Sequence, residues 1–247
     1  MFVKRYWKAG ISSLLAVIIM TGMCGCNMLT NNSWPPMNSS NNSTESAEKI
    51  VDDMTEYLKS KYGDIDFTVI SFFRKGFDFP YDIMHAYITG GDKKLDEFWV
   101  KRFKTDTETT YIDSYFGLQI YDDYQEMVKP IAGKYFKNCK IYASFANEFS
   151  NAMTGKSSLQ DAIDAKEGTL CMLWIEVEAG TFADEAAFKA SANAFLDEWE
   201  KKELESIVRI FYLKEGIYDS IDRNNHLNIF DGDEDYQAEV YKSFISK

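Results

Sequence analysis

Two carboxylates of this 247-residue chain are candidates for catalysis. Glu176 and Glu178 stand two positions apart in a strand-like run, so their side chains would lie on one face of the strand. Glycoside hydrolysis uses two carboxylates, one as an acid and the other as a nucleophile or base. Because charged residues also mark the point where a strand reaches solvent, we favour a strand end over an acid/base pair.

A second acidic group, Asp231-Gly232-Asp233-Glu234-Asp235, could direct alternate carboxylates at a calcium ion. The run does not fit the residue pattern of an EF-hand loop. Tyr236 stands where that loop needs glycine, and Lys242 stands where it needs a bidentate glutamate. A solvated turn is the favoured interpretation, and we predict no metal site.

The histidines and cysteines provide few further candidates for a catalytic or metal site. Only two histidines occur, His85 and His226, which excludes a multi-histidine metal centre, and His85 is expected to be structural. Cys139 and Cys171 lie in strand-like runs. They could form a disulfide in an oxidising compartment, but two buried thiols are favoured.

The familiar catalytic motifs are absent from the sequence. It contains no Gly-x-Ser-x-Gly elbow, no phosphate loop ending in Lys-Ser or Lys-Thr, no His-Glu-x-x-His and no Cys-x-x-Cys. We therefore assign no catalytic residue and no cofactor. A non-catalytic module that binds a protein, peptide or glycan is favoured, and the alternative is a hydrolase acting through carboxylates.

The N-terminus has the pattern of an export signal. Lys4, Arg5 and Lys8 give a positive start, and no acidic residue precedes Glu45. Residues 9–23 are apolar apart from small hydroxyl and glycine positions, and this run is shorter than the roughly 20 apolar residues that span a bilayer. The pattern predicts a signal peptide that is removed.

The segment ends Thr21-Gly22-Met23-Cys24-Gly25-Cys26 and resembles a bacterial lipoprotein signal. The resemblance implies cleavage before a cysteine that carries lipid at the mature N-terminus. Cys26 follows the small residue Gly25, whereas Cys24 follows Met23, so residues 1–25 are the expected signal peptide and Cys26 the lipid attachment site. Met23 and Cys24 depart from the usual leucine and small residue. The alternatives are a secretory signal without lipid and an uncleaved anchor.

The net charge of the chain limits the classes of molecule that it can bind. The chain has 39 acidic and 27 basic residues, a net charge of -12, and loss of residues 1–25 would remove three positive charges. This sign argues against nucleic acid and against an electrostatic hold on anionic lipid. The membrane is therefore expected to be bound through the lipid, on the extracytoplasmic face of a bacterial membrane.

Residues 26–44 are rich in Asn and Ser and carry no charge, which predicts a disordered tether after the lipidated cysteine. Residues 45–247 should then form one acidic globular domain. Helices are expected at 47–62, 122–136, 158–165 and across the apolar stripe Phe188, Ala192, Phe195, Leu196 and Trp199. Strands are expected at 64–73, 83–89, 96–104, 111–117, 139–145, 169–178 and 206–213.

These elements predict an α+β fold, a mixed or antiparallel sheet of about six or seven strands packed by three principal helices. Asp122 and Gln125 should cap the second helix, and Pro130 should kink it. The strand, helix and strand over 169–213 allow a βαβ-like crossover. Trp99 and the 111–116 segment are the candidate contact residues for a positively charged partner, whose association should weaken with salt.

Overall fold

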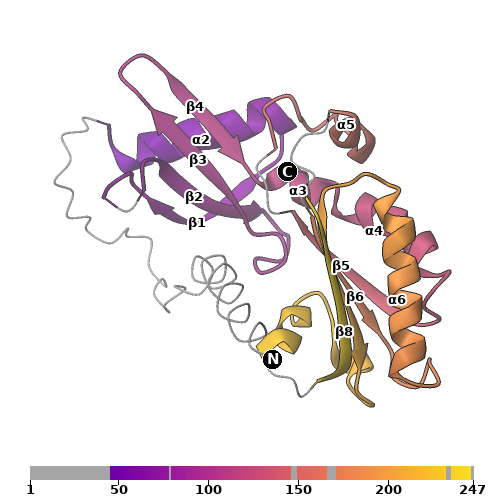
Figure 1. Ribbon diagram of the computed structural model, residues 1–247. Helices are drawn as coiled ribbons and strands as arrows, with labels where there is room; N and C mark the ends of the chain where they lie inside the picture. Colours follow the sequence, from indigo (N-terminus) through magenta and orange to yellow (C-terminus); the bar gives the residue numbers. More distant parts are fainter. Residues whose placement is uncertain (1–44, 78, 146–148, 166–170, 232–234, 246–247) are drawn as a thin grey trace. The chain divides into compact units, whose positions relative to one another are not determined.

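The computed structural model describes residues 45–77, 79–145, 149–165, 171–231 and 235–245. The predicted signal peptide, Cys26 and the tether lie outside these residues. The fold is α+β, as expected, but it has two four-stranded sheets in place of one sheet of six or seven strands (Figure 1). No helix in the described ranges is long and apolar enough to cross a membrane.

The N-terminal sheet is an antiparallel meander in which each strand pairs with the next in sequence. Its strands are β1 (Phe67–Phe73), β2 (Asp82–Ile88), β3 (Phe98–Lys104) and β4 (Thr109–Asp113). The connections 74–81, 89–97 and 105–108 explain this order, because a parallel pair would need a crossover of about a dozen residues or more.

Helix α2 (Ala47–Tyr62) packs on the inner face of this sheet, and local signals set both of its ends. Ser46 accepts a hydrogen bond from the Lys49 backbone N–H and caps the first turn. Gly63 follows the last turn with a φ of 93°, a conformation that glycine adopts without strain. The predicted helix at 47–62 is confirmed.

A buried ion pair fastens the end of α2 to the end of β4. The Lys61 ammonium lies 2.8 Å from the Asp113 carboxylate, and both side chains are almost wholly buried. Tyr57 and Tyr62 also donate to Asp113, each over 2.7 Å. Burial and the Asp113 charge raise the pKa of both tyrosines, so they remain neutral donors. Removing one partner of such a pair leaves an uncompensated buried charge.

The first described residue, Glu45, belongs to a second ion-pair network. Its carboxylate lies 2.8 Å from the Lys104 ammonium and 2.9 Å from the Arg102 guanidinium. Arg102 is buried and also bonds Asp82 over 3.1 Å. Hydrogen bonds from Lys104 and Arg102 lower the pKa of Glu45 to about 2. Glu45 is therefore part of the folded domain.

The C-terminal sheet has the order β5-β6-β7-β8 and mixed pairing. Its strands are β5 (Cys139–Phe145), β6 (Cys171–Val177), β7 (Ser206–Leu213) and β8 (Tyr236–Phe244). β6 and β7 are parallel and are joined through α6 (Glu185–Glu200), which confirms the βαβ-like crossover. The predicted stripe of α6 is buried, and Asp184 caps the helix at the Ala187 N–H. β8 is an additional strand.

Two local expectations for the middle of the chain are wrong. The expected strand at 111–117 ends at Asp113, because the Asp113 carboxylate accepts from the Tyr115 N–H and the chain turns into helix α3 (Tyr115–Gln119). Helix α4 (Tyr121–Ala132) starts without a side-chain cap, so Asp122 and Gln125 do not form the predicted pair. Pro130 lies inside α4, near its last turn.

The short helix α5 (Leu159–Asp164) has a full capping box from Ser158 and Asp161.

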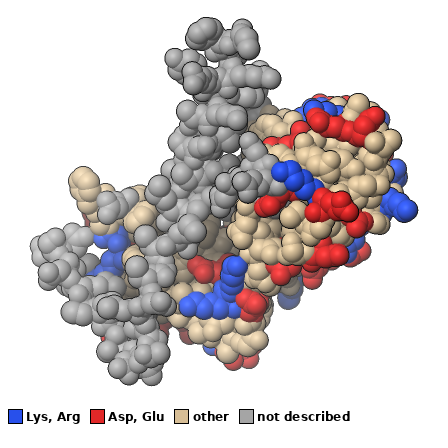
Figure 2. Space-filling view, turned by 90° about the horizontal axis from the view of Figure 1, so that it is seen from below, with Lys and Arg blue, Asp and Glu red and all other residues tan. Residues whose placement is uncertain are grey.

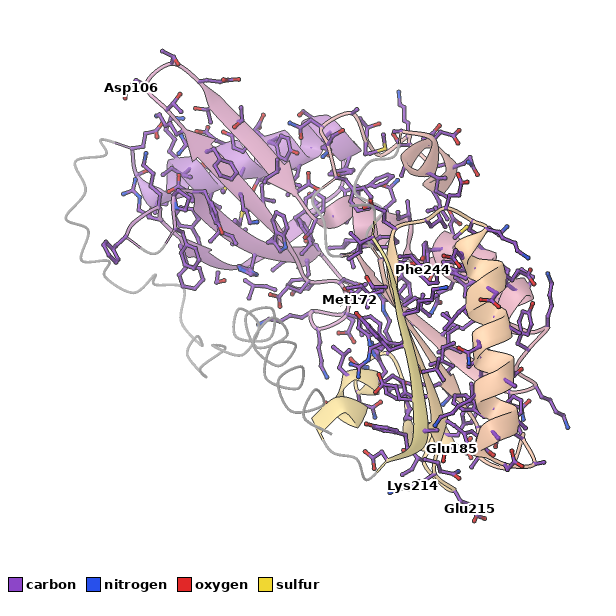
Figure 3. All side chains as sticks on the ribbon, in the orientation of Figure 1. Asp106, Met172, Glu185, Lys214, Glu215 and Phe244 are labelled. Carbon is purple, nitrogen blue, oxygen red and sulfur yellow. The ribbon has the colours of Figure 1, made fainter. Side chains whose placement is uncertain are left out.

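The main core cluster contains buried side chains from both sheets and from α2, α4 and α6. A satellite cluster on the opposite face of the C-terminal sheet contains Tyr142, Trp174, Phe211, Leu213 and Ile221. Met172 packs against the satellite cluster and Phe244 against the main core. Both residues are labelled in Figure 3. Residues 217–226, which include the short helix η1 (Tyr218–Ser220), cover the satellite cluster, and we call them the covering segment.

Candidate functional site

The N-terminal sheet carries aromatic side chains on its outer face, opposite α2. Antiparallel sheets usually present polar residues on the face that is not packed. Here the last residue of β1, the β1–β2 connection and the outward positions of β3 are rich in rings. We call this set the aromatic face: Phe73, Phe77, Phe79, Tyr81, Trp99 and Phe103.

Ring contacts run across the aromatic face. Phe79 lies 5.7 Å from Tyr81, and Tyr81 lies 5.2 Å from Phe103, measured between ring centroids. The Lys101 ammonium sits 4.0 Å from the Trp99 ring centroid and 5.1 Å from that of Tyr81. Tyr81 therefore contacts Phe79 and Phe103 directly and is linked to Trp99 through the Lys101 ammonium, which the two rings bind by cation–π attraction.

Neither core cluster includes any residue of the aromatic face. Phe73 is 52% exposed, Phe79 is 39% exposed and Phe77 is fully exposed. Scattered apolar residues are ordinary on a protein surface, but a contiguous exposed patch marks an interaction site. The aromatic face is the candidate binding surface of the domain.

The predicted contact residues separate into two groups. Trp99 is half-buried on the aromatic face. Tyr115 and Phe116 are buried in the core, and Tyr111 stacks on Tyr57 at the inner face. The prediction that the 111–116 segment contacts a partner is therefore wrong. The other aromatic-face residues were missed, although the cluster of Phe77, Phe79 and Tyr81 around Pro80 was visible in the sequence.

Glu176 is not the solvated strand end that the sequence suggested. It lies within β6, is fully buried, and neither of its carboxylate oxygens has a hydrogen-bond partner among the described residues. Burial raises the pKa of Glu176 to about 8, and the Lys140 charge offsets part of that effect. Glu178 lies beyond the end of β6 and accepts a hydrogen bond from Asn138 over 2.6 Å. The two residues are in different environments.

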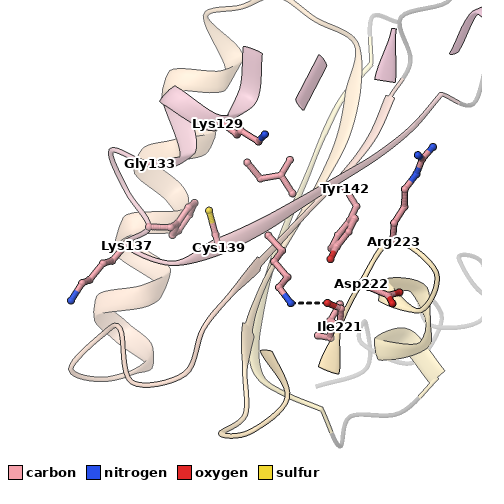
Figure 4. Close-up of a pocket in the computed structure, with 11 residues that line it drawn as sticks. Lys129, Gly133, Lys137, Cys139, Tyr142, Ile221, Asp222 and Arg223 are labelled. Atoms are coloured by element: carbon pink, nitrogen blue, oxygen red, sulfur yellow. Dashed lines mark hydrogen bonds between the residues drawn. The ribbon is translucent and has the colours of Figure 1, made fainter. Parts of the chain in front are cut away.

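A pocket of about 610 Å³ lies beside β5, the edge strand of the C-terminal sheet (Figure 4). Asp222 is the acidic residue that lines it, and Glu176 is not among the lining residues. The carboxylate alternative needs two carboxylates that face one substrate. This pocket supplies one.

The two histidines have structural partners. His85 on β2 lies 3.0 Å from the Glu97 carboxylate, on the outer face of the N-terminal sheet. His226 is buried, stacks on Tyr142 with ring centroids 4.4 Å apart, and bonds the Arg223 carbonyl. Burial lowers the pKa of His226.

Cys139 and Cys171 are free thiols at opposite ends of the β5–β6 ladder, because Cys139 pairs with Val177 and Cys171 with Phe145. Six register positions at about 3.4 Å each separate them, far beyond disulfide reach. Burial raises the pKa of Cys139 to about 11 and that of Cys171 to about 12. Both thiols are therefore protonated and unreactive near neutral pH.

Two predicted features lie partly or wholly outside the described residues. Cys26 is one, and residues 232–234 of the acidic run 231–235 are the other. Within the part of the chain that the structure describes, no group of three His, Cys, Asp or Glu side chains could hold a metal ion.

Comparison with known proteins adds little. No protein-family model and no curated protein matches the chain. The chain is similar to the crystal structure of a DUF5037 family protein from Ruminococcus gnavus ATCC 29149 at 2.55 Å resolution. The identity is 12%, the match covers 69% of this chain and 78% of that chain, and the TM-score is 0.39. A similarity of this size carries no argument about fold or function.

Proposed function

We propose that the chain is a membrane-anchored lipoprotein of the bacterial cell envelope, whose domain from residue 45 onward is a non-catalytic binding module. The single observation behind the binding role is the exposed aromatic face, which belongs to neither core cluster. The anchor rests on the lipoprotein-like signal that ends at Cys26.

The partner that fits the aromatic face best is a positively charged protein or peptide. Its lysine and arginine side chains would stack on the rings as Lys101 does on Trp99. The acidic excess of the chain would attract such a partner over a distance. On the side of the molecule that Figure 2 shows, acidic side chains (red) occur in several groups, with basic side chains (blue) between them.

The alternative, an envelope hydrolase, depends on Glu176. A fully buried carboxyl with a raised pKa is a common feature of active sites, but structural groups show it too. Turnover of a glycan, ester or peptide that is lost on a single carboxylate change would favour the hydrolase and overturn the binding proposal.

Ring removal tests the binding surface. Phe77→Ser combined with Phe79→Ser should release a basic partner from an envelope pull-down, and rising salt should release it from the unchanged chain. The matched control is Tyr241→Ala, which removes a 45%-exposed ring on β8, outside the aromatic face. Equal retention by the double variant and the control would overturn the proposed surface. Specific binding of a neutral glycan without any protein partner would overturn the proposal of a positively charged partner.

A separate experiment tests the anchor. Cys26→Ser should move the protein out of the membrane fraction or leave it unprocessed, and mass spectrometry of the native protein should find lipid on Cys26. An unmodified mature N-terminus at another residue would contradict the anchor and leave the binding proposal standing.

A further inference from the structure

The pocket beside β5 has a charge opposite to that of the whole chain. Four basic side chains line it, Lys129, Lys137, Lys140 and Arg223, against one acidic side chain, Asp222. The lining therefore has a net formal charge of +3 in a protein of net charge -12. The pocket volume of about 610 Å³ is within the range of small-molecule sites.

The two central cations are fixed in place. The Lys140 ammonium donates to the Tyr218 and Ile221 carbonyls, each over 2.6 Å (Figure 4). The Arg223 guanidinium lies 3.9 Å from the Tyr121 ring centroid. One N–H group of this guanidinium donates to the Leu95 carbonyl over 3.4 Å, and a guanidinium has five N–H donors, so others remain for an oxyanion. The two contacts hold the side chain, and little side-chain entropy remains to be lost on binding.

Of the neighbouring carboxylates, Glu126 offsets part of this charge, because it forms an ion pair with the Lys129 ammonium. Asp222 and Glu176 offset less of it. The Asp222 carboxylate accepts from the Asn224 and Asn225 N–H groups over 2.7 and 3.2 Å, and so shapes its own turn. Glu176 pairs with Lys140 in the β5–β6 register. It is mostly protonated at neutral pH, because burial raises its pKa to about 8.

The rest of the lining is largely apolar and aromatic, with Phe136, Ile141, Tyr142 and Ile221 beside the basic residues. Ligand sites combine such an apolar floor with a few polar groups that fix orientation. We propose that the β5 pocket binds a small organic anion, whose carboxylate or phosphate is held by the basic side chains and whose body covers the apolar floor. This site is separate from the aromatic face.

Titration calorimetry of the purified chain tests the proposal with glucose 6-phosphate, glucuronate, inorganic phosphate and glucose. The phosphorylated or carboxylated sugar should bind, and glucose, which has the same body without the charge, should not. Binding of inorganic phosphate as tight as that of the sugar phosphate would assign the site to the free ion instead of an organic anion. Failure of every anion to bind at millimolar concentration would overturn the proposal.

Matched variants test whether the anion binds in the β5 pocket. Arg223→Met and Lys129→Met should each weaken anion binding about tenfold, the loss expected for one charge-assisted hydrogen bond. Lys202→Met removes the same charge at an exposed position outside both the pocket and the aromatic face, and it should change nothing. An equal loss in all three variants would show a response to net charge alone and would overturn the site. Lys129 has a 53%-exposed side chain, so its variant keeps the test valid if Arg223→Met fails to fold.

The pH dependence gives an independent readout. Lys140 and Tyr142 face Glu176 from β5, Tyr218 faces it from the covering segment, and β7 places Phe211 beside it. Above pH 8 the ionised Glu176 offsets the Lys140 charge, so anion affinity should fall. Glu176→Gln should keep the affinity constant over the same range. An equal fall in this variant would contradict the coupling between Glu176 and the pocket.

Discussion

At the scale of single residues, Glu176 carries the clearest pH signature. Its pKa is about 8 in the folded protein, against an ordinary value of 4.5. Below the ordinary value both the folded and the unfolded chain are protonated. As pH rises to about 8, the unfolded chain loses the proton while the folded chain keeps it, so this residue lowers the free energy of unfolding throughout that window.

Glu176→Gln should remove this loss, because glutamine fills the same volume and stays neutral. Above pH 8 the variant should be more stable than the unchanged chain by on the order of 3 kcal/mol, and the difference should shrink toward acidic pH. Urea unfolding at several pH values measures it. Glu178→Gln, at a partly exposed position, is the control and should shift little. Parallel pH profiles for Glu176→Gln and the unchanged chain would contradict the prediction.

The sequence contained part of the information about Glu176. The neighbouring Leu173, Trp174, Ile175 and Val177 predict a central strand, and β6 has that position. A lone glutamate at the end of such a run is more often a strand end in solvent. The covering segment, which places Tyr218 near Glu176, lies about 40 residues later in the chain. Periodicity within one strand does not detect a contact of that kind.

At the scale of elements, the best-predicted ones have strong local signals. Helices α2 and α6 show apolar stripes at spacings of three and four and have side-chain caps at Ser46 and Asp184. The division into two sheets was not predicted, because which strands pair depends on contacts between distant residues. β8 was missed because Glu239 and Lys242 interrupt its apolar pattern, as is common on the edge strand of a sheet.

Helix α6 offers a matched test of its packing. Ala192 is fully buried in the main core, and Ala190 is exposed on the same helix. Ala192→Leu should lower the free energy of unfolding by about 1–3 kcal/mol, because the core has no room for the added carbons. Ala190→Leu should change it by less than about 0.5 kcal/mol, since leucine is also a good helix former. Chemical denaturation compares them, and equal effects would contradict the orientation of α6.

At the scale of the whole molecule, the domain begins earlier than its first helix. A chain that starts at Ser43 keeps Glu45 and the Ser46 cap and should unfold cooperatively. A chain that starts at Ala47 loses both and should be less stable by about 1–3 kcal/mol. Thermal unfolding of the two chains measures the difference. Glu45→Gln and Ser46→Ala, made separately in the longer chain, divide the effect between the ion pairs and the cap. Equal stability of the two chains would show that neither contributes.

The position of Glu45 also determines how the domain would bear a mechanical load. A pull applied from the N-terminal side reaches the described part of the chain at this residue. The Arg74 side chain holds its carbonyl over 2.6 Å, and Arg102 and Lys104 hold its carboxylate. The force therefore passes to β3 and to the residue that follows β1 before it reaches the first turn of α2. In a protein held to a membrane through its N-terminus, these contacts would keep the first turn of α2 from being pulled off the sheet. Weakening the contacts to Glu45 would lower the force at which the domain begins to unfold.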